Sequence, residues 1–320
     1  MRADFVRRLL QLAERDDRIF LITGDLGFGV LTEFATRLPR QYLNAGIAEQ
    51  NMSSIACGLA MEGRIVFTYA IANFPTLRCL EHVRNSICYH DANVKIVATG
   101  CGFSYGHLGV SHHATEDLAI MRALPNMVVV APCDEREAAS AVDALVERPG
   151  PAYVRLDKSS AGTADWPAST FRLGEARTLR NGTDLCLIGV GGVLGEALAA
   201  ADRLAEEGIS ARVLSMHTLK PLDRAAVAAA VKETGGIITI EEHNLIGGLG
   251  SAIAEVCMDE GLRPARFQRI GIRDHYVSIS GDQDHLRHLY GLDSNAITRA
   301  AYDLLDRGCK WRPQAVDKTA

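Results

Sequence analysis

One carboxylate stands out in the stretch Asn44-Ala-Gly-Ile-Ala-Glu-Gln-Asn-Met52. Glu49 precedes a run of small and apolar residues, 53–60, that predicts a buried helix. Arg40 is the nearest cation in the sequence. Burial favours the protonated form of a carboxyl group, so Glu49 could share a proton near neutral pH. The alternative is a glutamate that stabilises the first turn of a helix through the helix dipole.

Other residues capable of chemistry follow predicted strands. In α/β proteins ligands bind beyond the carboxyl ends of the strands, so these residues are expected to share one edge of a sheet. Four strands are predicted, at 18–23, 64–70, 94–99 and 152–156. The candidates lie at the ends of these strands or in the segments that follow them: Asp25, Leu26, Phe74, Arg78, His107, His112, His113 and Arg155.

The segment Gly46-Ile-Ala-Glu-Gln50 resembles the glutamate motif of the transketolase-like thiamine diphosphate enzymes. These include transketolase, deoxyxylulose-phosphate synthase and the beta subunits of 2-oxoacid dehydrogenases. In that family the glutamate hydrogen-bonds the aminopyrimidine ring and favours the imino tautomer, which removes the thiazolium C2 proton. The resulting ylid is the electron sink. The resemblance implies this catalytic role for Glu49.

The same resemblance implies a cofactor pocket around Glu49. It places Asp25 in the pyrimidine pocket and makes Leu26 and Ile47 apolar props for the bent cofactor. The segment 78–87 is similar to two-chain members of the family, which puts Phe74 at the position that stacks on the pyrimidine and Arg78 beside it. The alternatives are an Asx-turn at Asp25 and a core role for Phe74.

Ser111-His112-His113 resembles the Thr-His-Gln step of transketolase, whose histidine faces the reacting centre. His112 matches that residue, and a histidine there can protonate or hydrogen-bond an oxygen of the intermediate. Arg155 matches a strand-end arginine that contacts substrate phosphate in transketolase. A guanidinium is well suited to binding phosphate, and a structural salt bridge is an equally weighted alternative for Arg155.

The loop before His112 departs from transketolase, which reads Thr-His-Asp and then Gly-Glu-Asp-Gly there. Gly100 stands where a substrate-contacting histidine is expected, and Leu108 stands where an aspartate reads a hydroxyl of the acceptor. A site without that aspartate loses its preference for the hydroxyl. Ordinary acceptors such as ribose 5-phosphate are therefore expected to be poor, and a modified sugar, a nucleotide-linked sugar or another aldehyde or ketone is expected instead. His107 or His113 could substitute for the missing groups, or the loop could repack so that His107 takes over.

No Gly-Asp-Gly motif occurs in the sequence. The family uses that motif and an Asn-Asn pair to bind Mg²⁺ and the diphosphate, and Mg²⁺ requires near-octahedral oxygen ligands. The resemblance therefore implies a split enzyme, in which a separate N-terminal subunit carries the Gly-Asp-Gly and Asn-Asn motifs. We expect thiamine diphosphate between the subunits, no metal ligands on this chain, and an α2β2 heterotetramer.

The elements that must position these residues alternate between strand and helix. This pattern predicts an α/β fold with two doubly wound, mostly parallel-sheet domains at 1–160 and 181–320, joined by a linker at 161–180. The resemblance identifies the first as a pyrimidine-binding domain and the second as a transketolase-type C-terminal domain. Helices are expected at 2–16, 75–89, 116–123, 195–207, 250–259 and 294–305 and after Asp134 and Asp223. Further strands are expected near 42–43 and at 127–131, 184–190, 211–215, 236–241 and 267–272.

Composition narrows the class of protein. A net charge of −5 argues against nucleic acid as a partner, and no apolar run is long enough for a membrane span. The start of the chain does not read as a signal peptide. The eight cysteines lack metal-binding spacing and read as reduced, buried thiols of a cytoplasmic protein.

The leading hypothesis is a beta-type subunit of a split, transketolase-like enzyme that transfers a two-carbon ketol or acyl unit to an aldehyde or ketone. Alternatives are a beta-type subunit of a 2-oxoacid dehydrogenase and a subunit similar to deoxyxylulose-phosphate synthase. A non-catalytic relative is a further alternative, against which Glu49, Phe74 and His112 argue.

Overall fold

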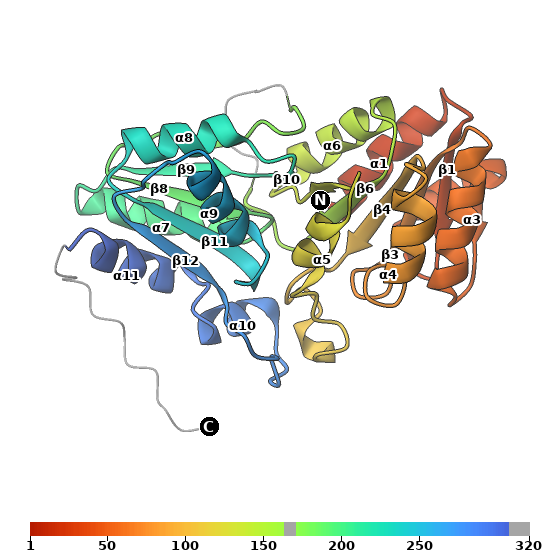
Figure 1. Ribbon diagram of the computed structural model, residues 1–320. Helices are drawn as coiled ribbons and strands as arrows, with labels where there is room; N and C mark the ends of the chain where they lie inside the picture. The colour runs from red at the N-terminus through yellow and green to blue at the C-terminus, as the bar shows by residue number, and fades with distance from the viewer. Residues whose placement is uncertain (163–170, 307–320) are drawn as a thin grey trace.

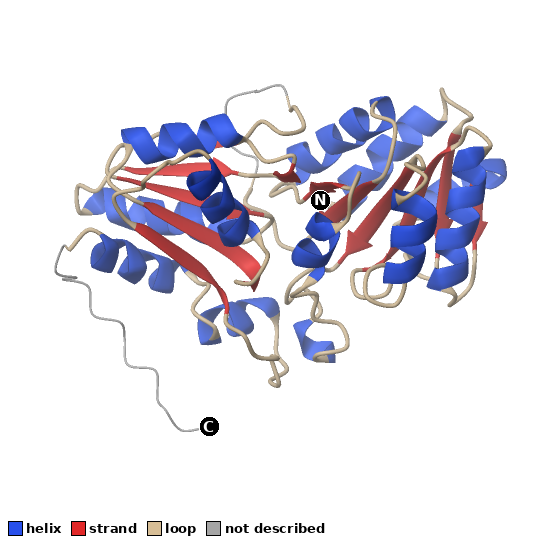
Figure 2. Cartoon of the chain, viewed as in Figure 1, coloured by secondary structure: helices blue, strands red, loops and turns tan. Residues whose placement is uncertain are grey.

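The computed structural model describes residues 1–162 and 171–306, which form two α/β units side by side (Figure 1). In each unit helices cover both faces of a mostly parallel sheet (Figure 2). This arrangement confirms the predicted fold class, because alternating strands and helices bury both faces of a parallel sheet. Within the described ranges, no helix has the length and apolar character needed to cross a bilayer.

The first unit contains a seven-stranded sheet with the order β10-β5-β6-β4-β3-β1-β2. Its strands are parallel except for β10, which pairs antiparallel with β5. Most of its strands are short apolar runs, as expected for a sheet covered on both faces. They are β1 (Ile19–Thr23), β2 (Tyr42–Asn44), β3 (Ile65–Ile71), β4 (Val94–Thr99), β5 (Val128–Val130), β6 (Ala152–Leu156) and β10 (Thr218–Lys220).

The helices of the first unit differ from the predicted ones mainly after β3. The predicted helix 75–89 is wrong in its first turns. Residues 73–79 form turns, held in part by a hydrogen bond from Thr76 Oγ1 to the Ala72 carbonyl, and helix begins only at Leu80. The helices are α1 (Arg2–Ala13), α2 (Thr32–Arg37), α3 (Glu49–Met61), α4 (Leu80–His82) with the π-helix Val83–Cys88, α5 (Asp117–Ala123) and α6 (Glu135–Glu147), with 3₁₀ turns at Pro39–Gln41 and Gly106–Leu108.

The second unit contains a five-stranded sheet with the order β12-β11-β8-β9-β7. Residues 177–180, predicted as the end of the linker, instead form the antiparallel edge strand β7, while 163–170 lie outside the described residues. The strands are β7 (Arg177–Arg180), β8 (Leu185–Val190), β9 (Ala211–Ser215), β11 (Ile237–Asn244) and β12 (Phe267–Ile272). The helices are α7 (Leu194–Glu206), α8 (Arg224–Glu233), α9 (Leu249–Asp259), α10 (Gln283–Leu289) and α11 (Ser294–Leu304).

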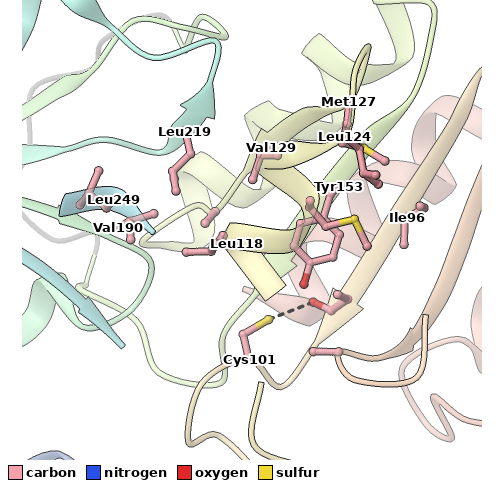
Figure 3. Close-up of a cluster of buried hydrophobic side chains, with 14 of the residues drawn as sticks. Ile96, Cys101, Leu118, Leu124, Met127, Val129, Tyr153, Val190, Leu219 and Leu249 are labelled. Carbon is pink, nitrogen blue, oxygen red and sulfur yellow. Dashed lines mark hydrogen bonds between the residues drawn. The ribbon is translucent and has the colours of Figure 1, made fainter. Parts of the chain in front are cut away.

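Apolar packing joins the two units. Strand β10 comes from the second half of the chain but completes the first sheet, with Thr218 opposite Val130. One continuous core contains Leu118 of α5 together with Val190 and Leu249 of the second unit (Figure 3). The cysteines of the described residues are free and buried, as predicted: Cys57, Cys79, Cys88, Cys101, Cys133, Cys186 and Cys257.

Candidate active site

The carboxyl ends of β1, β2, β3, β4 and β6 meet at one edge of the first sheet, because these strands are parallel neighbours. The loops that leave them carry almost all of the predicted site residues. Charge and ring contacts connect Glu49, Arg78, Phe74 and His112 in one row along this edge.

Glu49 is the first residue of α3 and its side chain is only 2% exposed. Its Oε2 accepts a hydrogen bond from Arg78 Nη1 at 2.8 Å. Gly24 lies so close that a Cβ there would be 3.2 Å from Glu49 Cγ. The sequence suggested a carboxylate with no cation nearby, but the turns after β3 bring Arg78 to it. A helix N-terminus and an ion pair therefore hold this carboxylate in one position.

Asp25 connects the loops after β1 and β2. Its Oδ1 accepts a hydrogen bond from Asn44 Nδ2 at 2.9 Å, and its backbone N–H donates to Asn44 Oδ1 at 3.0 Å. Asp25 has a φ of 58°, a backbone conformation that aspartate tolerates better than most residues. Leu26 is half-buried against the core, whereas Ile47 is 78% exposed beside Glu49. The two loops thus form a fixed rim that presents an apolar side chain next to a buried carboxylate.

Phe74 lies between Arg78 and His112. The Arg78 Cζ atom is 4.8 Å from the centroid of the Phe74 ring, and the His112 ring meets Phe74 edge to face at 5.4 Å. Ser111 Oγ is 3.0 Å from His112 Nδ1. Burial lowers the pKa of His112, and the neighbouring His107 and His113 lower it further. His112 is therefore a neutral imidazole at neutral pH, able to accept or donate one hydrogen bond at each ring nitrogen.

The two histidines proposed as substitutes occupy different environments. His107 is exposed on the 3₁₀ turn after β4. His113 is 3% exposed, its Nε2 is 3.2 Å from the Gly106 carbonyl, and its own carbonyl accepts from Asn73 Nδ2 at 2.7 Å. A substrate that enters from the open edge would not reach a side chain enclosed in this way. The structure thus corrects the expectation for His113, whose contacts hold the loop together.

Arg155 lies inside the protein on β6. Its Nε donates to Asp117 Oδ2 at 2.8 Å, and its Nη2 donates to the carbonyls of Ala114 and Glu242, each at 3.0 Å. Both partners of the ion pair are buried. The structure thus corrects the expectation of a phosphate contact and favours the alternative, a structural ion pair within the first unit. The hydrogen bond to the Glu242 carbonyl links this pair to the second unit.

Sequence reasoning missed a group of residues next to His112. The rings of Tyr105 and His112 are 6.3 Å apart. Arg2 Nη1 donates to Tyr105 Oη at 3.3 Å, and Lys158 Nζ lies 3.6 Å from the centroid of the Tyr105 ring. Arg2 opens the first helix and Lys158 follows β6, so spacing along the chain gave no signal that they meet.

Arg2 and Lys158 place positive charge at this end of the row. Burial lowers the pKa of Lys158, and the nearby Arg2 lowers it further, although Asp157 acts in the opposite direction. The Asp157 carboxylate pairs with Arg287. Within residues 1–162 and 171–306 we find no ion pair formed by Arg2 or Lys158. Two like charges held close together without a carboxylate partner favour an anion between or beside them.

The second unit holds the loop after β4. Glu242 Oε1 accepts from the Phe103 N–H at 2.6 Å and from Gln283 Nε2 at 2.9 Å. Gln283 Nε2 also donates to Asp157 Oδ1 at 3.0 Å. Burial raises the pKa of Glu242, while the adjacent Arg287 opposes this change. These contacts fix the loop that carries Tyr105 and His112 against the second unit.

Two family models match the chain. The model "Transketolase, pyrimidine binding domain" matches residues 1–163, and the model "Transketolase, C-terminal domain" matches residues 174–297. The two matches fall on the two α/β units.

Individual relatives match along nearly the whole chain. An apulose-4-phosphate transketolase subunit from Phocaeicola vulgatus is 40% identical over 96% of this chain and 97% of its own length. A 6-deoxy-6-sulfo-D-fructose transketolase subunit from Clostridium sp. is 37% identical over 96% of this chain and 95% of its own. A solved structure described as "Split gene transketolase, inactive beta4 tetramer" superposes with a TM-score of 0.86 at 37% identity and covers 95% of this chain and 98% of that one.

Proposed function

This chain belongs to the transketolase family as a subunit of the split type, and we propose that it supplies the proton-handling half of a site that transfers a two-carbon ketol unit to a modified sugar. The observation that carries this proposal is the row formed by Glu49, Arg78, Phe74 and His112 at the open edge of the first sheet.

Family membership implies dependence on thiamine diphosphate, and the residues at this edge fit its pyrimidine end. The buried carboxylate of Glu49 lies two residues after Ile47, which is 78% exposed, and the loop after β1 carries Phe28, which is 85% exposed. A flat heterocycle with polar edges would cover such side chains and engage the carboxylate. When bound, the cofactor supplies the electron sink for the cleaved carbon–carbon bond.

Each residue of the row has its own part. Glu49 would exchange a proton with the cofactor ring, and Arg78 keeps the carboxylate in place. Phe74 would stack on the ring, and Leu26, Ile47 and Asp25 would shape the pocket. His112 hydrogen-bonds the substrate oxygen that gains or loses a proton, which a neutral imidazole can do in either direction.

We assign the Mg²⁺ and diphosphate ligands to a partner subunit. The sequence contains no Gly-Asp-Gly motif, and Mg²⁺ needs more oxygen ligands than a single Gly-Asp pair provides. The partner would carry Gly-Asp-Gly and Asn-Asn motifs and combine with this chain as an α2β2 heterotetramer. The solved split-gene relative supports this view, because its tetramer of beta chains alone is described as inactive.

Reconstitution tests the split. The isolated chain is expected to bind thiamine diphosphate weakly or not at all in calorimetry with Mg²⁺ present, because the diphosphate ligands are elsewhere. Co-expression with a partner subunit that carries the Gly-Asp-Gly and Asn-Asn motifs should give both cofactor binding and ketol transfer. The mass of the pair should correspond to two copies of each chain. Tight cofactor binding by the isolated chain, or a pair that contains only one copy of each, would contradict the proposal.

The substrate we propose is an anionic, modified sugar. Gly100 and Leu108 replace the groups that read ordinary acceptors in transketolase, and Arg2 and Lys158 place positive charge next to His112. Two relatives are named for sugars that end in a phosphate or a sulfonate. Both groups are anions with several oxygen acceptors, which suits a site with paired cations.

Steady-state assays of the reconstituted complex test this choice. With xylulose 5-phosphate as the donor, ribose 5-phosphate is expected to be at least ~10-fold worse in kcat/KM than the best branched or sulfonated aldose tested as the acceptor, since the hydroxyl-reading aspartate is absent. Efficient transfer to ribose 5-phosphate would show that the loop reads ordinary acceptors after all.

A further inference from the structure

Gly100 and Tyr105 occupy one space. Gly100 has a φ of 75°, and a Cβ built on it would lie 1.9 Å from Cε2 of the Tyr105 ring. No side chain at position 100 can coexist with this placement of the tyrosine. The glycine that departs from the transketolase pattern therefore makes room for Tyr105, whose ring takes the place of the expected histidine.

Tyr105 is held firmly in this position. Its hydroxyl oxygen accepts from Arg2 Nη1 at 3.3 Å, and Lys158 Nζ covers the ring at 3.6 Å from the centroid. The next residue, Gly106, lies against the second unit, where an added Cβ would meet the Gly281 carbonyl oxygen at 2.5 Å. The backbone next to the ring is thus packed between the two units.

The Tyr105 hydroxyl still has a proton to donate. A phenol oxygen can accept one hydrogen bond and donate another, and the bond from Arg2 uses only its acceptor capacity. Hydrogen bonds to an anionic oxygen are stronger than those between neutral groups. An oxygen of a phosphate or sulfonate between Arg2 and Lys158 would be a suitable acceptor for this proton.

We propose that Tyr105 is a specificity-determining residue: its hydroxyl donates a hydrogen bond to the terminal anionic group of the sugar, and its ring closes the space above Gly100. This inference rests on the proposed function and adds a substrate contact to it. The chemistry is shared by phosphate monoesters and sulfonates, which the test separates.

The main variant is Tyr105→Phe in the reconstituted complex, which removes the hydroxyl and keeps the ring. Acceptors are D-glyceraldehyde, D-glyceraldehyde 3-phosphate and the corresponding three-carbon aldehyde with a terminal sulfonate, with neutral L-erythrulose as the donor. We expect kcat/KM to fall by about 10- to 100-fold for the anionic acceptor that the enzyme uses, and by less than ~3-fold for D-glyceraldehyde. The acceptor that loses activity identifies the anion.

Tyr89→Phe is the matched control, because Tyr89 is an exposed tyrosine on the π-helix side of the first unit. It should leave all three rates unchanged. An unaltered preference between charged and neutral acceptors in Tyr105→Phe would overturn the inference.

A double-mutant cycle tests the shared space. Gly100→Ala should push the tyrosine out and lower the preference for the anionic acceptor about as much as Tyr105→Ala does. The double variant should be no worse than either single one, since both remove the same contact. Additive losses would overturn the claim that Gly100 serves to seat Tyr105. If the complex transfers no ketol unit to any acceptor, the proposed function fails, and this inference fails with it; transfer with an unchanged preference overturns the role of Tyr105 alone.

Discussion

Glu49→Gln in the reconstituted complex is expected to lower kcat by at least ~10²-fold, the usual range for loss of a positioned acid or base. The amide oxygen can still accept the hydrogen bond from Arg78 Nη1, so the pocket should keep its shape. An amide cannot take up and return a proton, and this is the step that depends on Glu49. Steady-state kinetics with saturating cofactor gives the loss in kcat, and calorimetry shows whether the cofactor still binds.

Glu62→Gln is the control for this variant. Glu62 is the exposed residue that caps the C-terminal end of α3, the helix that Glu49 begins. Its replacement changes the charge equally and should leave kcat near that of the wild type. Near-normal turnover of Glu49→Gln would mean that another group handles the proton.

Arg155→Leu is expected to destabilise the chain by about 3–5 kcal/mol, because it leaves a buried charge without its partner. Asp117 would then keep Tyr153 Oη at 2.6 Å from its Oδ2 and His243 Nε2 at 4.0 Å from its Oδ1, but burial lowers the pKa of His243 to about 4, so neither neighbour replaces the cation at neutral pH. Urea unfolding of the isolated chain, followed by circular dichroism, measures the change. Replacing both partners, as in Asp117→Asn with Arg155→Leu, should cost less than the single change.

Arg299→Leu serves as the reference, since Arg299 is exposed on α11. It should change the free energy of unfolding by less than ~0.5 kcal/mol. If Arg155→Leu unfolded like the wild type and chiefly raised the KM of a phosphorylated sugar, the substrate contact expected from the sequence would be correct.

Local patterns predicted the strands and the start of the helix at Glu49 well. The run Val94–Thr99 is apolar throughout and is a buried strand, and Glu49 begins the helix that its small neighbours suggested. Such features depend on residues close in sequence, where periodicity and a known motif carry the information.

Features that depend on distant partners could not be predicted in this way. Strand β10 is three residues long and exists because β5 offers it an open edge. The ion pair between Arg78 and Glu49 forms because residues 73–79 are turns, whereas the sequence pattern after β3 predicted a helix there. The meeting of Arg2 with Tyr105 depends on packing of the first helix beside the sheet. Tertiary context determines all of these contacts, and spacing along one sequence does not encode it.

The crossing of β10 into the first sheet affects how the protein is made and how it could be recombined. On a ribosome the first sheet remains incomplete until residues near 220 have emerged, so β5 waits with an unpaired edge while the second unit is synthesised. Open edges recruit other strands, which makes this interval sensitive to association with other chains. A chimera joined between residues 163 and 170 would combine two foreign surfaces at β5 and β10 even if each unit folded well. Exchange of units among relatives should therefore succeed only when Thr218–Lys220 travels with the sheet that it completes.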